Sequence, residues 1–394
     1  MILLVDGKIF RQFFHKKGIK LNICLKIRMQ HSMDSDDDNM VSSDTKIEKE
    51  EKRGVVGMAN LGNTCFMNAC IQNIRHILEW TIFCTNGKIK DHISDESSSS
   101  SKILMAYSDL LKSLWAGSSP AYVNPKGFYH IVKEQVKDTL YEDFGKRTPQ
   151  DTHEFLVWLL DQMYMGSQNK VHMELLEKDH NSMNYKASFA WKQAFENTYS
   201  PLSDIIFGLL RIQNTCQRCN HSFYRWETFN TLKIGVENSQ LLENLEAEFG
   251  EEEIEDYDCE HCKASPGSRP SCKKTIKIWR LPKILILTLK RFTYDSFGRK
   301  KMNHVTIEEN VAFEEYFVDE SKETSKTRKY KLFGTVDHHG HALGGGHYTA
   351  QCYSLIYKHW YMYDDETAYN IPNPIFGPQT YLLFYRQENM IPNK

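Results

Sequence analysis

Two cysteines stand five positions apart in the stretch GNTCFMNAC, residues 62–70. Cys65 follows NLGNT, in which Gly62 and Asn63 suit a turn and Asn63 or Thr64 can cap a helix. A sulfur at the start of a helix lies at the positive end of the helix dipole, which favours the thiolate. Cys65 is therefore a candidate nucleophile. A buried structural thiol is the alternative, and it would be the default without a base elsewhere.

Cys70 belongs to a different pattern. Positions five apart on a helix are turned by roughly 140° from each other, so Cys65 and Cys70 cannot share one role. The residues that repeat at helical spacing along this segment are apolar: Met67, Cys70, Ile71, Ile74, Ile77 and Leu78. We expect Cys70 to lie in the core.

A base for Cys65 is offered by the segment HHGHALGGGHYTAQC, residues 338–352. Its three consecutive glycines allow a close approach of another chain, and His347 then opens a predicted strand. The strands predicted at 347–354 and 359–365 are joined by a short connection, which favours an antiparallel hairpin. A turn centred near 356–357 places His347 opposite about residue 366, so Asp364 is within about two positions of it.

This spacing predicts a thiol-protease arrangement. Asp364 would hold one imidazole nitrogen of His347 and leave the other to take the proton of Cys65. Asp365 is expected to point to the opposite face of the strand. It is a secondary catalytic candidate, which would act without direct contact to Cys65 or His347. Asn60 can supply side-chain N–H groups to an oxyanion, together with the backbone N–H of Cys65. A turn-stabilising asparagine is the alternative for Asn60.

Two C-x-x-C pairs predict a metal site. Cys216 and Cys219 form the first pair, Cys259 and Cys262 the second, with residues 220–258 between them. Four thiolates suit tetrahedral zinc and leave no open position for water or substrate, so we expect a structural zinc ion and no organic cofactor. Two redox dithiols are the alternative, which is less favoured because neither pair adjoins a predicted helix start.

The composition bounds the class of protein. The chain has 394 residues, 41% of them hydrophobic, and its 49 basic and 51 acidic side chains sum to −2. This balance gives no argument for a nucleic-acid or membrane partner. No apolar run approaches the roughly 20 residues of a membrane span, and no signal peptide is recognisable. We therefore expect an intracellular protein, cytoplasmic or nuclear, whose ten cysteines are reduced.

The order of the predicted elements indicates an α+β fold. Residues 1–53 are expected to be a disordered or weakly ordered extension, and 54–390 a single folded domain. Helical periodicity dominates 66–165, with one helix expected over 66–80. Beyond 205 the pattern changes to short strands, of which the clearest are 284–292, 330–339, 347–354, 359–365 and 381–387. Helices first and strands later favour segregated layers.

Several segments together resemble the ubiquitin-specific protease family. GMANLGNTCFMNACIQ (57–72) is similar to its cysteine box, and PQDTHEFLVWLLD (149–161) to its QDxHEF helix. LPKILILTLKRF (281–292) resembles its LKRF strand. GGHYTAQC, followed by WYMYDD and YLLFYR, resembles its histidine box and C-terminal strands. The blocks occur in the family's order.

The resemblance implies the family's papain-like cysteine peptidase fold, shaped as a hand. A helical thumb would occupy about 54–204, β-rich zinc-ribbon fingers about 205–280, and an antiparallel palm sheet about 281–390. It also implies that Cys65, His347 and Asp364 are catalytic and that Asn60 is the oxyanion residue. The implied reaction is hydrolysis of the bond after the C-terminal glycine of ubiquitin, through an acyl-thioester.

The resemblance also implies substrate contacts. Asp151 and Glu154 face the same way on a helix, which by itself suits a solvated acidic face. In the family they would meet the arginines of the LRLRGG tail of ubiquitin. Gly345, Gly346 and Tyr348 would line a channel that admits only a Gly-Gly end. The implied partners are ubiquitin and ubiquitinated proteins, bound by a monomeric catalytic domain.

Two other functions remain compatible with these residues. One is a pseudoenzyme that keeps the fold and binds ubiquitin as a scaffold, although intact Cys65, His347, Asp364 and Asn60 argue against it. The other keeps the chemistry and takes a ubiquitin-like modifier as its substrate.

Overall fold

The structure is a computed structural model that describes residues 2–5, 8–9, 53–87, 89–93, 95–116, 121–195, 198–263, 265, 268–293, 298–318, 328–342 and 344–388. The extension expected over residues 1–53 lies for the most part outside this range. Within it, β1 (Ile2–Val5) pairs antiparallel with β2 (Lys8–Ile9) and with β5 (His172–Glu174).

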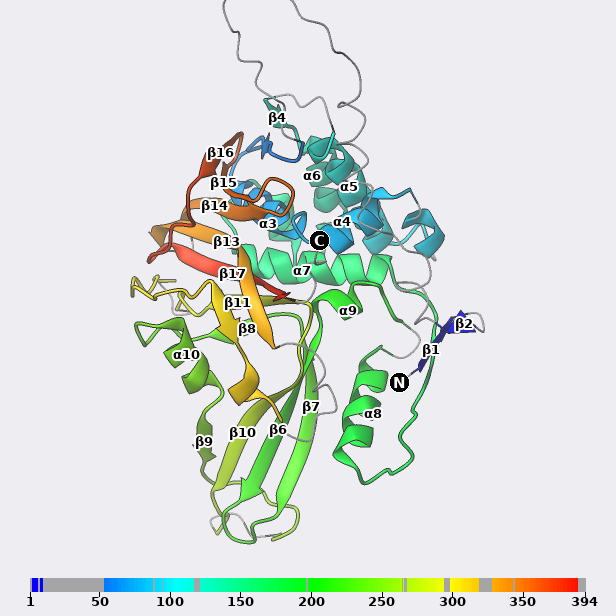
Figure 1. Ribbon diagram of the computed structural model, residues 1–394, viewed down its shortest axis with the longest axis vertical. Coiled ribbons are helices and arrows are strands. Elements are labelled where there is room, and N and C mark those ends of the chain that lie inside the picture. The colour runs from blue at the N-terminus through cyan, green and yellow to red at the C-terminus, as the bar shows by residue number, and fades with distance from the viewer. Residues whose placement is uncertain are drawn as a thin grey trace, which may run out of the picture.

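The helices gather at one end of the molecule, with exceptions near the fingers (Figure 1). Their bounds are α3 Cys65–Ile74, α4 Leu78–Thr85, α5 Ser99–Leu114, α6 Lys126–Val136, α7 Thr152–Gly166, α8 Met183–Phe195, α9 Ser203–Ile206 and α10 Leu241–Glu248. None of these helices is long and apolar enough to cross a membrane. The single helix expected over 66–80 is wrong, because Ile77 leaves helical geometry between α3 and α4.

The helix that begins with Cys65 is buried on every side. All ten residues of α3 are buried, and the helix packs against both α7 and the sheet strand β14 (Gly345–Ser354). The helical periodicity predicted for 66–165 includes an apolar stripe on α7, and its residues Phe155, Leu156, Leu159, Leu160 and Met163 are fully buried. Phe155 meets the ring of Phe66 edge-on at 5.3 Å between centroids, which fixes α7 against the first turn of α3.

The palm is a twisted sheet in the order β16-β15-β14-β13-β17-β11-β8, with β12 paired to β13. Its remaining strands are β8 Leu232–Ile234, β11 Ile284–Leu289, β12 Asn310–Ala312, β13 Lys329–Ala342, β15 His359–Asp364, β16 Thr367–Ile371 and β17 Thr380–Gln387. The five predicted strands are all present. The sheet is antiparallel except between β8 and β11, which run parallel.

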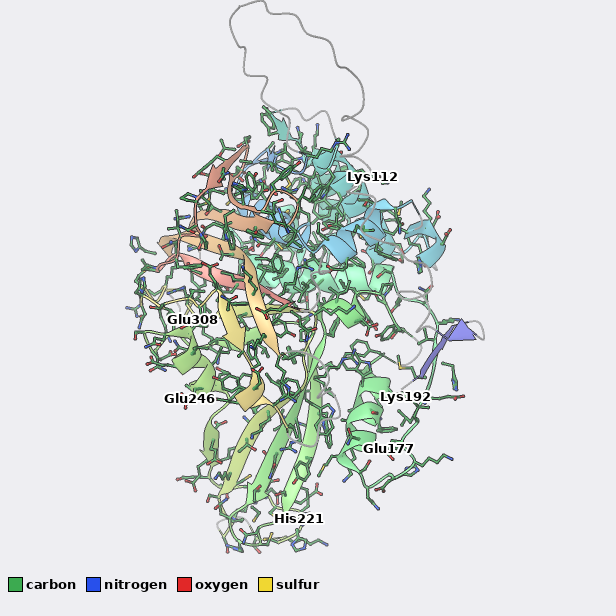
Figure 2. All side chains as sticks on the ribbon, in the orientation of Figure 1. Lys112, Glu177, Lys192, His221, Glu246 and Glu308 are labelled. Atoms are coloured by element: carbon green, nitrogen blue, oxygen red, sulfur yellow. The ribbon has the colours of Figure 1, made fainter. Side chains whose placement is uncertain are left out.

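The fingers are a separate four-stranded sheet in the order β7-β6-β10-β9. Its strands are β6 Gly208–Cys216, β7 Ser222–Phe229, β9 Glu251–Ile254 and β10 Cys272–Arg280. The sheet extends away from the thumb and palm, and His221 marks its far tip (Figure 2). A short parallel pair, β3 (Gly57–Met58) with β4 (Tyr122–Val123), lies in the thumb just before the turn that leads to Cys65.

Candidate active site

Cys65 is the first residue of α3, at the end of a turn that is built by side chains. Gly62 and Asn63 adopt positive φ angles of 99° and 54°. Thr64 occupies the N-cap position as expected, but its hydroxyl accepts from the backbone N–H of Leu61 rather than from the helix. The Asn60 amide oxygen accepts from the backbone N–H groups of Gly62 and Thr64, at 2.9 and 3.1 Å. The turn therefore presents Cys65 at the helix mouth, where it is 7% exposed.

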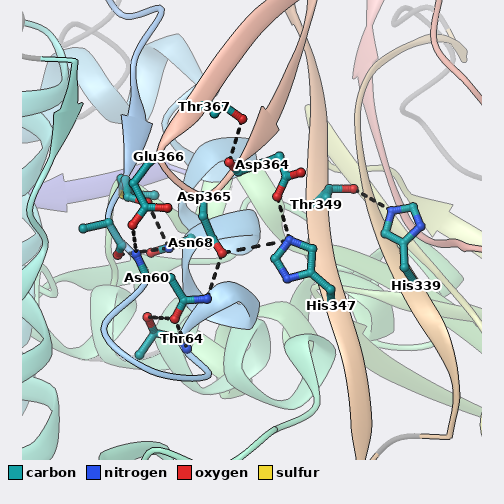
Figure 3. Close-up of polar contacts among 12 residues, drawn as sticks. Asn60, Thr64, Asn68, His339, His347, Thr349, Asp364, Asp365, Glu366 and Thr367 are labelled. Carbon is teal, nitrogen blue, oxygen red and sulfur yellow. Dashed lines mark hydrogen bonds and ion pairs between the residues drawn. The ribbon is translucent and has the colours of Figure 1, made fainter.

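The hairpin of β14 and β15 brings His347 to Asp364. Ala350 pairs with Tyr363 in this ladder, which agrees with the register predicted from the sequence. The Nε2 atom of His347 lies 2.6 Å from Oδ1 of Asp364 (Figure 3). Because Nε2 is engaged by Asp364, Nδ1 is the nitrogen that remains for the hydrogen bond between His347 and Cys65.

The hydrogen bonds of His347 favour its protonated form. The hydrogen bond with Cys65 is the largest cause that raises the pKa of His347, and the bond with Asp364 adds to it against the opposing effect of burial. The pKa is raised from 6.5 to about 9. At neutral pH the imidazolium is therefore the stable form, beside a sulfur at the positive end of a helix.

Asp365 differs from its predicted position. The expectation that it points to the opposite face of the strand is wrong, because β15 ends at Asp364 and Asp365 has a φ of 42°, which breaks the alternation of faces. Its Oδ2 lies 3.9 Å from Nε2 of His347 and accepts a hydrogen bond from Nδ2 of Asn60 at 2.8 Å. Burial raises the pKa of Asp365, and hydrogen bonds from Asn68 and Asn60 oppose the rise.

Two residues that the sequence analysis missed complete this network. Asn68 donates from Nδ2 to Oδ1 of Asp365 at 2.8 Å, and Oε1 of Glu366 accepts from the backbone N–H of Asn60 at 2.9 Å. Gly57 lies so close that an added Cβ would be 2.2 Å from the carbonyl oxygen of Glu366. The signal in the sequence was Asn68 itself, which is one of three amide side chains, with Gln72 and Asn73, among the mostly apolar residues of this helix.

A narrow cavity adjoins Cys65. Its lining residues come from the turn before α3, the segment before α7 and the neighbouring strands β13 and β14: Asn63, Cys65, Phe66, Pro149, Gln150, His338, Gly346 and Tyr348. Gly346 has a φ of 148°, and an added Cβ would be 2.6 Å from both the carbonyl oxygen of His339 and Nε2 of His338. Only glycine fits this position. An added Cβ at Gly345 meets nothing within 4 Å.

The two acids of the QDTHEF segment do not form one solvated face. Asp151 is buried at the N-cap of α7, where it accepts from the backbone N–H of His153 at 2.7 Å and from the hydroxyl of Tyr381 at 3.0 Å. Burial raises its pKa. Glu154 is exposed on the first turn of α7. Of the two, Glu154 is the one open to a charged ligand in this arrangement.

The four cysteines of the C-x-x-C pairs converge at the tip of the fingers. Their sulfurs all lie within 4.8 Å of one another. Sγ of Cys216 is 3.6 Å from Sγ of Cys262, and Sγ of Cys219 is 3.8 Å from Sγ of Cys259. Sulfurs held tetrahedrally at 2.3 Å from a zinc ion are about 3.8 Å apart, so the cluster has the size and ligand set of a zinc site.

A family model described as ubiquitin carboxyl-terminal hydrolase matches residues 56–385. Among curated proteins, Drosophila melanogaster ubiquitin carboxyl-terminal hydrolase Usp2 is 28% identical over 364 residues, covering 90% of this chain and 37% of that protein. Bos taurus ubiquitin carboxyl-terminal hydrolase 2 is 28% identical over 355 residues, covering 84% of this chain and 55% of that protein. The chain thus spans about a third to a half of the length of these relatives.

Solved structures share the fold. The SAGA Ubp8/Sgf11/Sus1/Sgf73 DUB module bound to ubiquitin aldehyde aligns with a TM-score of 0.66 and 22% identity, covering 87% of this chain and 71% of that chain. The SAGA DUB module bound to monoubiquitin aligns with a TM-score of 0.66 and 20% identity, covering 92% and 74%. The α+β fold class expected from the sequence, with thumb, fingers and palm, is confirmed.

The protonation of His347 can be measured without any substrate. Because its folded pKa is raised, the imidazolium should persist through neutral pH and be lost as the pH rises through about 9. NMR titration of the ring should show this midpoint in the wild type. The midpoint should fall further in Cys65→Ala than in Asp364→Asn, because Cys65 is the largest cause of the shift.

His339 is the internal control, since it is the β13 residue paired with His347 and burial lowers its pKa. Its midpoint should lie below 6.5 in all three proteins. A midpoint for His347 at or below that of His339 would contradict the assigned contact with Cys65.

Proposed function

The chain belongs to the ubiquitin carboxyl-terminal hydrolase family, and from that premise we propose that it is a thiol-dependent deubiquitinase. It hydrolyses the isopeptide or peptide bond after the C-terminal glycine of ubiquitin. The observation that carries this proposal is the hydrogen-bonded series Cys65, His347 and Asp364 beside a cavity whose wall admits only glycine at 346.

The first half of the reaction forms a thioester. The Cys65 thiolate attacks the carbonyl carbon of the terminal glycine, and the carbonyl oxygen becomes an oxyanion. As the C–N bond breaks, the His347 imidazolium gives its proton to the departing amine nitrogen. The raised pKa of His347 supports this role, because the proton is already on the ring at neutral pH.

The second half releases ubiquitin. Neutral His347 takes a proton from water, and the resulting hydroxide attacks the thioester carbonyl. Collapse of the second oxyanion breaks the C–S bond and returns the Cys65 thiolate beside the imidazolium. Asp364, at 2.6 Å from Nε2, keeps the ring oriented with Nδ1 toward the sulfur through both halves.

Asn60 is the proposed oxyanion donor. One N–H of the Asn60 side-chain amide donates to Oδ2 of Asp365, with 2.8 Å between Nδ2 and Oδ2. The second N–H of the same amide remains for the oxyanion, together with the backbone N–H of Cys65. Because Asp365 accepts from Asn60 and lies 3.9 Å from His347, we assign it the role of holding Asn60 in place rather than orienting the base.

The ubiquitin tail is proposed to enter between thumb and palm. Gly345 and Gly346 leave room for the backbone of the tail's two glycines, and Tyr348 forms part of the cavity wall next to Cys65. Exposed Glu154 is the proposed partner for a tail arginine. Buried Asp151 supports the same segment and can add its charge to the attraction.

The four-cysteine cluster is proposed to hold a structural zinc ion. Cys216, Cys219, Cys259 and Cys262 would supply all four ligands, and the ion would tie the turn after β6 to the turn after β9. Its contribution is to the shape of the fingers and not to bond cleavage, because four protein ligands leave no open position.

A ubiquitin probe with a C-terminal electrophile tests the function. The wild type should form a covalent adduct at Cys65, and Cys65→Ala should form none and abolish hydrolysis while still binding ubiquitin. Cys70→Ala is the matched control, because Cys70 lies in the same helix, is fully buried, and should leave labelling intact. Ubiquitin binding without an adduct in the wild type would refute the enzyme, and labelling only by another modifier's probe would refute ubiquitin as substrate.

The oxyanion role of Asn60 can be separated from its structural role. Asn60→Ala should lower kcat by about 10²- to 10³-fold, the usual effect of losing one oxyanion donor. Alkylation of Cys65 by iodoacetamide develops no oxyanion, so its rate should change by less than about threefold. Equal losses of hydrolysis and alkylation in Asn60→Ala would show that Asn60 acts only by shaping the turn.

Metal analysis tests the fingers. Cys216→Ser should lose the bound zinc of the wild type and lower the melting temperature, because the cluster then lacks a ligand. Cys272→Ser is the control, since Cys272 is buried and pairs directly with Cys216 across β6 and β10 but lies outside the cluster. Unchanged zinc content in Cys216→Ser would refute the ligand set.

A further inference from the structure

A lysine is buried behind the wall of the active-site cavity. Lys300 is 8% exposed, and its Nζ donates a hydrogen bond to the backbone carbonyl of His338. Its backbone N–H donates to the carbonyl of His341 at 3.0 Å. Lys300 therefore contacts β13 at two points, on the segment that leads into the glycine-rich loop before His347.

The segment around Lys300 is itself held between two elements. Lys300 forms an antiparallel β-bridge with Phe292, just after β11. The neighbouring Arg299 forms an antiparallel β-bridge with Ala342, the last residue of β13. The backbone N–H of Lys301 donates to the carbonyl of Arg291 at 2.6 Å. Residues 298–301 thus connect the end of β11 to the end of β13.

The ammonium group of Lys300 interacts with two buried charged side chains, the Asp337 carboxylate and the Arg291 guanidinium. Burial and, to a smaller extent, the cation of Arg291 lower the pKa of Lys300 to about 8, against the opposing charge of Asp337. Asp337 is 1% exposed, and its Oδ2 accepts from Gln351 at 2.8 Å. Burying a lysine costs free energy that a leucine or methionine would not cost, so its presence at a buried position points to a specific contact.

The residue that Lys300 contacts, His338, is itself part of the cavity wall. The ring of His338 packs between Phe292 and Tyr348, at 5.2 and 4.7 Å between ring centroids. His338 lines the cavity together with Cys65 and Gly346. Because an added Cβ at Gly346 would be 2.6 Å from Nε2 of His338, the position of His338 sets the clearance of the cavity at this point.

We propose that Lys300 is a positioning residue for the substrate channel. By holding the carbonyl of His338, it fixes the wall opposite Gly346 and so sets the affinity for the two terminal glycines of the substrate. It does not touch the reacting atoms: Cys65 lies on α3, His347 on β14 and Asp364 on β15, whereas Lys300 bonds to β13. This inference rests on the proposed deubiquitinase function.

Steady-state kinetics on a ubiquitin substrate tests the proposal. Lys300→Met keeps the length of the side chain but cannot donate, and we expect KM to rise about tenfold, the usual scale for losing a hydrogen bond from a charged donor. The value of kcat should stay within about twofold, and so should the rate of Cys65 alkylation by iodoacetamide, because the proposed role does not involve bond cleavage. Lys300→Arg keeps both charge and donor and should restore most of the affinity.

The neighbouring lysine is the matched control. Lys301 pairs with Glu237 at the surface, with 2.7 Å between Nζ and Oε1, so Lys301→Met should leave KM unchanged. An unchanged KM in Lys300→Met would overturn the proposal. So would a loss of both kcat and alkylation rate that is the same in Lys300→Met as in Lys300→Arg, because such a loss would indicate a general structural role. A wild type that does not cleave the ubiquitin substrate would instead overturn the proposed function, which separates the two failures.

Discussion

The carboxylate of Asp365 joins the two halves of the candidate active site. Its oxygens accept from Asn60, in the turn before Cys65, and from Asn68, one helical turn after Cys65. Its backbone carbonyl accepts from Met58 at 2.7 Å, so the contact involves main chain as well as side chain. Cys65 lies in the thumb and His347 in the palm, and this cluster of hydrogen bonds joins those two layers beside the two residues. A buried carboxylate with several donors is suited to the task, because removing one partner leaves a charge unpaired.

The adjacent acids Asp364 and Asp365 differ in exposure and in the groups that they contact. The Asp364 side chain is 49% exposed and that of Asp365 is 9% exposed. Asp364 remains on the strand and holds Nε2 of His347, whereas Asp365 turns inward with a positive φ and serves the thumb. Two consecutive residues therefore bond to different partners, Asp364 to the ring of His347 and Asp365 to the turn before Cys65. Because β15 ends at Asp364, the first acid lies in an exposed environment and the second in a buried one.

The fingers contrast with the rest of the molecule in how they are stabilised. The thumb and palm share a large hydrophobic cluster, and a second cluster covers the opposite face of the palm. At the tip of the fingers the buried groups are sulfurs, and the neighbouring strand β9 (Glu251–Ile254) carries exposed acids. A four-stranded sheet with so little apolar burial at its tip would gain stability from a cross-link between its turns, which is what the proposed zinc ion would supply.

The sequence by itself determined the local features of the site. The turn and helix start at Cys65 follow from Gly62 and the periodicity after it, and the register of His347 against Asp364 follows from a short hairpin, because such features depend on near neighbours. Only the tertiary structure decided which distant groups meet. The inward turn of Asp365, its bonds to Asn60 and Asn68, the burial of Asp151 under Tyr381 and the contact of Lys300 with β13 all join segments far apart in the chain. Backbone periodicity sets the face on which a residue lies, whereas its partner is set by the packing of whole layers, which no local pattern encodes.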